Sequence, residues 1–272
     1  MHKRALACTL SIGILYSQVF SFGVTSIKPS KAEDFRRAGI QFLPGGRLIA
    51  TNYPLQVLIS GAYHLPYQSP RLVGGPEWVR SDRFDLYAKA DAGTIPSELS
   101  AEEKRARMRL MLQKLLADRF HLTLRRETKE LPVYAMTVAK NGLKLPKSAI
   151  EEKDCFDESA TVSCHTIQGG QGFGLHGKAF DLSDLAVFIE NYTDRPVIDK
   201  TGIHELFQIE TKGWVPLGGK AALPGMKAED GSDLASLPSL FTIFGEFGLR
   251  LEPQKGPVEI FVIEHVERPG AN

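Results

Sequence analysis

Four consecutive residues, Asp199, Lys200, Thr201 and Gly202, match the start of a loop that phosphoryl-transfer enzymes use to form an aspartyl phosphate. Such enzymes place the nucleophilic Asp at the end of the first strand of a parallel sheet, and further βα units then supply a Lys and acidic residues for magnesium. Only residues 203–272 follow the motif here, and each βαβ unit takes roughly 30 residues. The sequence therefore favours a turn, in which Asp199 bonds the backbone two residues on and Gly202 takes a positive φ.

Other nucleophilic chemistry has no supporting pattern. A Ser or Cys nucleophile needs a His base and an orienting carboxylate, and the sequence contains no GxSxG, HExxH or CxxC motif. Beyond the first few residues the histidines are scattered singly, at positions 64, 121, 165, 176, 204 and 265. We therefore expect no catalytic residue and no cofactor. A secreted hydrolase with a site between the two halves of the chain stays open as an alternative.

The first residues have the pattern of a secretory signal. His2, Lys3 and Arg4 precede an apolar run, residues 5–20, and small residues that follow offer a cleavage point. The run is shorter than the ~20 residues of a membrane-spanning helix. We expect residues 1–21 to be a signal peptide and the mature protein to be secreted or periplasmic. The alternative is an uncleaved anchor, which would be the protein's one attachment to a membrane.

Removal of the signal leaves two cysteines, Cys155 and Cys164. In an oxidising compartment an even pair most often forms a disulfide. The alternative is a metal site that uses both cysteines with His165 and His176, but this spacing fits no familiar zinc pattern. We predict a disulfide and no metal.

The nearly equal numbers of basic and acidic residues limit the classes of partner that the protein could bind through charge alone. The chain has 33 basic and 32 acidic residues, which argues against broad electrostatic capture of nucleic acid or of an anionic membrane. We therefore expect no nucleic-acid partner. With 272 residues, of which 43% are hydrophobic, the chain is long enough for two domains.

An internal repeat gives the strongest organisational signal. Residues 39–59 align without a gap on residues 166–186, an offset of 127 (166 minus 39). The same offset returns near the end of the chain, where Phe120, Leu122 and Leu124 meet Phe247, Leu249 and Leu251. We interpret the chain as two copies of one module.

The hydrophobic pattern of each copy predicts a small α+β module of βαββαβ order, with helices packed on one face of a mixed sheet. Apolar residues recur at helical spacing after the first extended segment, at positions 55, 58, 59 and 62 and at positions 182, 185, 186 and 189. We expect each copy to close with a hairpin, over residues 121–138 and 249–263. The expected parts are the first module (22–140), a linker with the Cys pair (141–165) and the second module (166–268), which carries a Gly/Pro-rich insertion (213–238).

Several residues of the first module could form a ligand or partner surface. The aromatic candidates are Trp78, Tyr63 and Tyr67, which could line a cleft or simply pack in the core. Arg125 and Arg126 belong to a basic stretch that could bind an acidic partner or form a solvated surface. His121 aligns with Gly248, so the module does not need this histidine to fold.

Resemblance to known proteins extends this interpretation. The element order of each half resembles the short N-terminal periplasmic domain of secretins and TonB-dependent receptors, which binds partner proteins. Segments such as "VGGPEWVRSDRFDLYAKA" and "RPVIDKTGIHELFQIE" are similar to an exported family of unknown function that is abundant in soil acidobacteria. Some relatives are joined to or encoded near BlaR-like membrane metallopeptidases. The resemblance implies a fold and a compartment, and no activity.

We expect a non-catalytic binding module in the periplasm or cell envelope, whose exposed sheet edges accept a strand from another cell-envelope protein. Two alternatives stay open: the secreted hydrolase named above, and a ligand-sensing ectodomain that works with a BlaR-like metallopeptidase.

Overall fold

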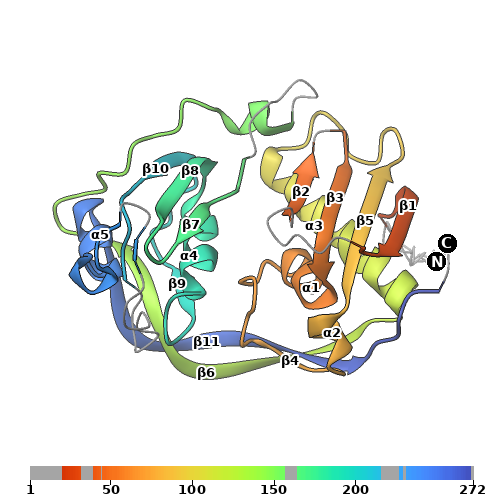
Figure 1. Cartoon of the computed structure of the whole chain (residues 1–272). Helices are drawn as coiled ribbons and strands as arrows, with labels where there is room; N and C mark the ends of the chain where they lie inside the picture. The colour runs from red at the N-terminus through yellow and green to blue at the C-terminus, as the bar shows by residue number, and fades with distance from the viewer. Residues whose placement is uncertain are drawn as a thin grey trace, which may run out of the picture.

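The computed structural model describes residues 20–31, 39–43, 45–156, 164–215, 227–228 and 231–270. The predicted signal peptide falls almost wholly outside these residues, as do parts of the predicted insertion. The described chain is a mixed α+β protein, as predicted, and it forms two units joined along one side by a long two-stranded ribbon (Figure 1). No helix among the described residues is long and apolar enough to cross a membrane.

The first unit is a four-stranded antiparallel sheet with helices on its buried face. The strand order is β1-β5-β3-β2. The elements are β1 (Phe22–Pro29), β2 (Gly39–Leu43), β3 (Arg47–Pro54), α1 (Leu55–Ala62), α2 (Trp78–Ser81), β5 (Arg83–Ala90) and α3 (Ala101–Phe120). Alternate strand residues such as Leu48 and Leu86 pack against α1 and α3 in one apolar core. A capping box between Ser100 and Glu103 starts α3, and His121 ends it in the left-handed region.

The second unit has a similar arrangement, with shorter strands and one strand fewer in its sheet. Its sheet has the order β10-β8-β7. The elements are β7 (Gln168–Gly170), β8 (Gly174–Phe180), α4 (Leu182–Glu190), β10 (Phe207–Glu210) and α5 (Leu240–Glu246). Phe180 and Phe207 lie opposite one another and pack with both helices in a second core. The apolar spacing in the sequence therefore predicted α1 and α4 correctly.

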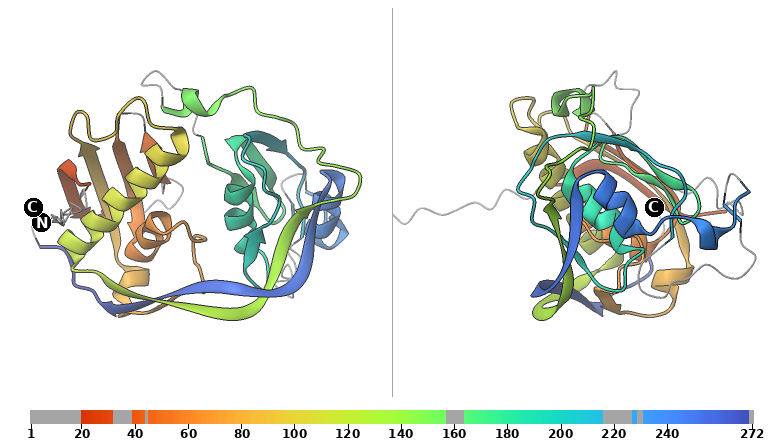
Figure 2. Two further views of the ribbon diagram at one scale, coloured as in Figure 1. Left: turned by 180° about the vertical axis from the view of Figure 1, so that it is seen from behind. Right: turned by 90° about the vertical axis from the view of Figure 1, so that its left-hand side faces the viewer.

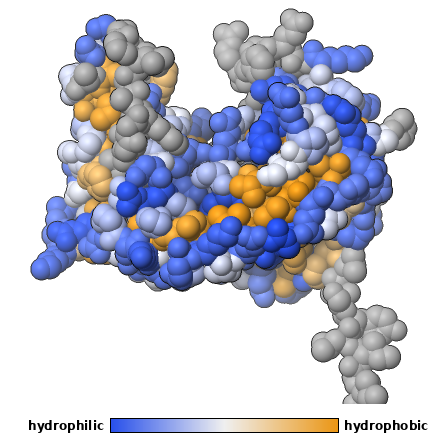
Figure 3. Space-filling model, turned by 90° about the horizontal axis from the view of Figure 1, so that it is seen from below, coloured by the Kyte–Doolittle hydropathy of each residue, from blue (hydrophilic) through white to orange (hydrophobic). Residues whose placement is uncertain are grey.

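The ribbon consists of β6 (Thr123–Val138) and β11 (Leu249–His265), paired antiparallel along their whole length. Its edges are extended by two short parallel strands, β4 (Leu72–Gly74) beside β11 and β9 (Val197–Asp199) beside β6. Figure 2 shows the ribbon running under both units from behind. Seen from below, apolar side chains form a band along the ribbon between hydrophilic borders (Figure 3).

The predicted closing hairpins are wrong. Each segment is one uninterrupted strand, and its partner comes from the other half of the chain. The physical reason is that the two ends of each strand belong to different cores. Leu124 packs with the first core, whereas Tyr134 and Met136 lie in the second. A strand that folded back on itself would remove apolar side chains from one of the two cores.

Strand registers recur at the offset found in the sequence. Gln41 pairs with Ile49 in the first unit, and Gln168 pairs with His176 in the second. The short parallel strands are placed similarly but not at the same offset: Tyr134 pairs with Val197 and Phe261 pairs with Leu72, so the offset is 127 (261 minus 134) in the ribbon and 125 (197 minus 72) in the short strands. Duplication itself stays a prediction.

The Asp199 motif forms a turn, as predicted. Asp199 ends β9, and its Oδ1 accepts hydrogen bonds from the Thr201 backbone N–H at 2.9 Å and from the Thr201 hydroxyl at 2.7 Å. Gly202 follows with a φ of 68°. The side chain of Asp199 therefore serves the backbone that leads from the ribbon to β10.

Candidate functional site

Charged side chains from distant segments meet where the two units face one another. We call this group the seam cluster; its members are His64, Arg105, Glu152, His165, Asp181 and Asp184. The first unit contributes the residues that follow α1 and the first turns of α3. The second unit contributes the N-terminus of α4, and the linker contributes Glu152 and His165.

Local structure fixes the acids and the histidine in place. Asp181 and Asp184 form the capping box of α4: Asp181 Oδ1 accepts from the Asp184 N–H at 2.8 Å, and Asp184 Oδ2 accepts from the Asp181 N–H at 3.1 Å. A disulfide joins Cys155 to Cys164, as predicted. It ties the short helix that carries Glu152 to the residue before His165. Such a bond is typical of proteins in oxidising compartments.

His165 is held on both sides by carboxylates. Its Nδ1 lies 2.6 Å from Asp184 Oδ2, and its Nε2 lies 2.9 Å from Glu152 Oε1. Burial alone would lower the pKa of His165, but the hydrogen bonds to Asp184 and Glu152 outweigh burial and raise this pKa to about 9. Arg105 Nη1 also contacts both ring nitrogens, and its charge opposes the rise of this pKa. Because a carboxylate lies at each ring nitrogen, neither nitrogen is available to act as a general base.

The acids of the seam cluster are also paired. Arg105 Nη2 lies 3.3 Å from Asp181 Oδ2, and His64 Nε2 lies 3.5 Å from Asp184 Oδ1. Burial acts to raise the pKa of Asp184, but hydrogen bonds from His165 and His64 lower it well below the usual range. Burial and the neighbouring charge of Asp184 raise the pKa of Asp181. Each carboxylate thus faces a cation.

The donor types in this cluster could hold a metal ion. His165, Asp181 and Asp184 offer ligand atoms that all lie within 4.8 Å of one another. Arg105, however, already supplies positive charge at Asp181. The metal site considered from the sequence is excluded, because both of its cysteines are in the disulfide and His176, on β8, pairs with Glu210 on the neighbouring strand β10.

A second ion pair crosses between the units at Arg71. Its Nε donates to Glu190 Oε1 at 2.9 Å, and its Nη2 donates to Oε2 at 3.1 Å. Glu190, at the end of α4, is only 4% exposed and also accepts from the Val197 N–H. Burial raises the pKa of Glu190, and Arg71 opposes this shift.

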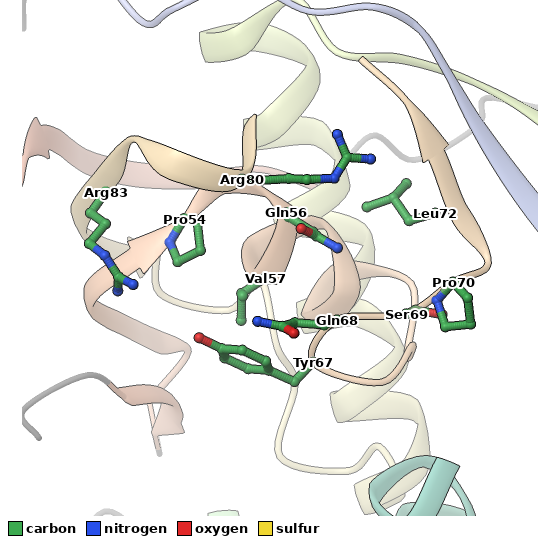
Figure 4. A pocket seen from close by; sticks show the side chains of 10 residues that line it. All are labelled: Pro54, Gln56, Val57, Tyr67, Gln68, Ser69, Pro70, Leu72, Arg80 and Arg83. Carbon is green, nitrogen blue, oxygen red and sulfur yellow. The ribbon is translucent and has the colours of Figure 1, made fainter. Parts of the chain in front are cut away.

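A cavity of about 420 Å³ opens in the first unit, beside the start of α1 (Figure 4). Its walls come from the end of β3, the first turn of α1, residues 67–72 and the segment around α2. Among the residues that line it, Tyr67, Arg80 and Arg83 are the ionisable ones. The lining Ser69 is buried, and its hydroxyl oxygen accepts from the Arg71 N–H at 3.1 Å.

A β-bulge shapes one wall of the cavity. The register of β3 on β5 shifts between Ala50 and Tyr53, and the intervening Asn52 has a φ of 57°. Its carbonyl oxygen accepts a 2.7 Å hydrogen bond from Arg83 Nη1. Bulges and strained backbone are common next to functional sites.

The predicted surface residues are not brought together in one site. Tyr67 alone lines the cavity. Tyr63 packs against Phe261, and Arg126 lies over both of these rings. Trp78 lies beneath Arg268. Two further pairings lie at the end of the ribbon, between His121 and Glu267 and between Arg125 and Glu264.

The sequence patterns did not identify the members of the seam cluster or the cavity, although the hydrolase alternative placed a site between the two halves. His165 was considered only as a metal ligand, and Arg105 belongs to the basic stretch that also contains Arg125 and Arg126. The one available signal was the Asp181 to Asp184 spacing, which is typical of a capping box. No sequence signal linked these acids to Arg105, because their contact is made between units.

One comparison with known proteins identifies a family. A family model described as a protein of unknown function, DUF3738, matches residues 56–266. No curated protein and no solved structure matches the chain. The resemblance of each half to the secretin and receptor domain stays a prediction.

Proposed function

Since the chain belongs to the DUF3738 family, whose description names no activity, we propose a function from geometry: the protein is a non-catalytic binding protein outside the cytoplasm. The cavity beside α1 is its ligand site. Another cell-envelope protein, or a fragment of one, is the partner.

One observation carries this proposal: the ionisable groups are arranged for binding. The residues lining the cavity include two arginines and a tyrosine, with no carboxylate, histidine or cysteine among them. General acid–base catalysis needs a group that titrates near the working pH and reaches the substrate. Arginine stays protonated, so it can hold an anion and cannot transfer a proton at neutral pH.

The disulfide between Cys155 and Cys164 supports a location outside the cytoplasm. Cytosolic thiols are normally kept reduced, and a pairing between two segments of a surface linker persists best outside the cytoplasm. The basic and apolar pattern of residues 1–21, which we propose to be a signal peptide, points the same way.

A hydrolase with its site in the seam cluster is the second candidate. It is favoured by the 2.6 Å contact between His165 and Asp184, which is the orienting half of a catalytic triad. Against it stands Glu152, which occupies the nitrogen that would take a proton from a nucleophile.

Activity assays on the purified mature chain separate the two candidates. We would assay esters, phosphate esters, peptides and glycosides with the parent protein, with His165→Gln and with Asp199→Ala. We expect no turnover by any of the three. Turnover that disappears in a folded His165→Gln variant but persists in Asp199→Ala would establish the hydrolase instead.

A further inference from the structure

We infer that β2, an edge strand of the first sheet, is a docking site for an extended, uncharged segment of a partner protein, which pairs with β2 as an added strand. The inference rests on the proposed binding function and names the part of a partner that the protein recognises. The lining of the cavity beside α1 includes no residue of β2, so the two surfaces are separate. In strand addition, main-chain hydrogen bonds give affinity and alternate side chains give specificity.

The strand β2 is paired on one side only. Its five residues, Gly39–Leu43, pair with residues 47–51 of β3. Among the described residues no strand lies along its other side, because β2 ends the order β1-β5-β3-β2. Figure 1 shows this end of the sheet on the side nearer to the second unit. The N–H and C=O groups of an edge strand that point away from its sheet are a template for another strand.

The apolar core of the first unit is left partly uncovered at β2. Phe42 pairs with Leu48, which pairs with Ala88, so these three side chains lie in one row on the core face of the sheet. Leu48 and Ala88 are completely buried, whereas Phe42 is 39% exposed. At the opposite end of the sheet the core-facing Ile27 of β1 is only 3% exposed. A strand added beside β2 would place an apolar side chain next to Phe42 and complete the burial of this row.

The strand β2 also lacks the features that normally protect an edge from pairing. Proteins protect edge strands with charged residues, prolines, bulges or a covering segment. The sequence of β2, GIQFL, contains no charged residue and no proline, and its register on β3 has no shift. Gln41, which lies on the face opposite to Phe42, is exposed and uncharged. A partner strand therefore meets no charged side chain on β2 itself.

Other edges in the described part of the chain are short or protected. The edge strand β1 carries Lys28 and Pro29 and has a bulge near its start. The linker covers β10, because backbone hydrogen bonds join residues 146–148 to residues 206–208. The open parts of the ribbon contain charged residues and prolines, and β4, β7 and β9 have three residues each. Within the described residues, β2 is therefore the edge best suited to accept a strand.

The length of β2 favours a single extended segment over a second copy of this chain. A stable interface between two folded proteins takes roughly 20–30 residues from each side. Pairing of β2 with the same strand of another copy would begin with five residues on each side. An extended segment needs no wider contact, because its own main chain bonds along the edge. The segment that fits has an apolar residue beside Phe42 and a polar residue beside Gln41.

Fluorescence anisotropy of the mature chain tests the inference with three labelled peptides. The parent peptide is Lys-Thr-Val-Thr-Val-Thr-Lys-amide. The second carries N-methyl groups on two adjacent central residues, which blocks one N–H on each edge of the peptide strand. In the third, Asp replaces both valines. We expect the second and third peptides to bind at least about tenfold more weakly than the first, because one loses main-chain hydrogen bonds and the other places charge beside Phe42.

Variants at the two ends of the sheet locate the contact. Phe42→Lys should weaken the parent peptide about tenfold, because a charged side chain at an edge opposes pairing. Val24→Lys is the matched control and should change nothing, since Val24 is an exposed apolar residue on the opposite edge strand of the same sheet. Thermal melts show whether each variant is folded. If Phe42→Lys does not fold, Phe42→Thr keeps a β-branched residue and should weaken binding about threefold.

Amide hydrogen exchange gives the position of the bound peptide. Exchange of residues 40–43 should slow when the parent peptide binds, and exchange of residues 67–72, beside the cavity, should not change. Slowing at the cavity alone would overturn the inference, as would equal binding of the three peptides, unchanged binding by the folded variant at Phe42, or no detectable binding of the parent peptide.

Sedimentation tests the other occupant of this edge. We expect the parent chain to be a monomer, and a dimer that Phe42→Lys abolishes would overturn the inference, because a second copy would then occupy β2. These results leave the non-catalytic function standing, which fails separately if the chain turns over a substrate.

Discussion

Arg71 and Glu190 form a bidentate ion pair across the two units, with the carboxylate almost completely buried. Arg71 also follows Ser69 and Pro70, which line the cavity. The cavity wall in one unit and the end of α4 in the other are therefore held by one contact.

Replacing Glu190 by Gln should destabilise the protein by roughly 3 kcal/mol, because the partly buried Arg71 loses its counter-charge inside the protein. Urea unfolding measures the change. Glu252→Gln, at an exposed and loosely paired site on β11, is the control and should stay within about 0.5 kcal/mol of the parent. An Arg71→Met/Glu190→Leu double variant should recover much of the loss, and a loss equal to that of Glu190→Gln would show that the pair does more than balance charge.

Stability should fall in mildly alkaline solution because of His165. Its pKa is raised from 6.5 to about 9 in the folded protein, so its contribution is fully present below pH 6.5 and is lost as the pH rises through 9. The contribution is on the order of 3 kcal/mol. We would measure unfolding between pH 6 and pH 10 for the parent and for His165→Gln, with the exposed His204→Gln as control. An alkaline loss that is unchanged in His165→Gln would contradict the assignment.

The carboxylate of Asp184 in the seam cluster should make the stability of the protein fall in acidic solution. The pKa of Asp184 is lowered in the folded state, so its stabilising contribution is full above the unfolded value of ~3.9, begins to decrease below that value and is lost as the pH falls through the lowered folded pKa. An Asp184→Asn variant should be less stable than the parent at pH 6 and should approach it at acidic pH. Unfolding at pH 3 and pH 6 provides the comparison, and an equal deficit at both values would argue against this linkage.

Reduction of the disulfide should cost about 2–3 kcal/mol, the entropy expected for a loop of about ten residues. It should also release Glu152 from His165, so that the alkaline loss of stability becomes smaller. A Cys155→Ser/Cys164→Ser double variant should behave like the reduced parent. Alkylation of the exported protein under non-reducing conditions provides a direct check, because two freely reactive thiols would show that the bond is absent in the native compartment.

Asp199→Ala should cost about 1 kcal/mol at most, since it removes one side-chain acceptor of a turn. Thermal unfolding gives the size of the effect. A much larger loss would mean that the turn controls the pairing of β9 with β6.

Patterns within one segment were enough to predict much of the fold. Helical spacing around Leu55 and Leu182 predicted α1 and α4, and Gly202 predicted the turn. The same patterns gave the wrong partner for Thr123–Val138, because alternation shows which side chains are buried and not which strand lies alongside.

Patterns within single segments could not predict the candidate site, for a related reason. Arg105 and Asp181 look like solvated residues in the sequence, and they become partly buried partners only when the two units pack together. The bulge at Asn52 shapes one wall of the cavity, and no sequence pattern that we used predicted a bulge in this strand.

The ribbon has a consequence for the order in which the chain folds as it is made. β4 precedes residue 75, yet the strand beside it includes Phe261, which is synthesised 189 residues (261 minus 72) after its partner Leu72. Until that segment has been made, the first half of a growing chain has an unfinished core and an open strand edge. Long-range pairing of this kind folds slowly and exposes unpaired strands. A growing chain would therefore benefit from a chaperone that covers β4 until β11 has been made.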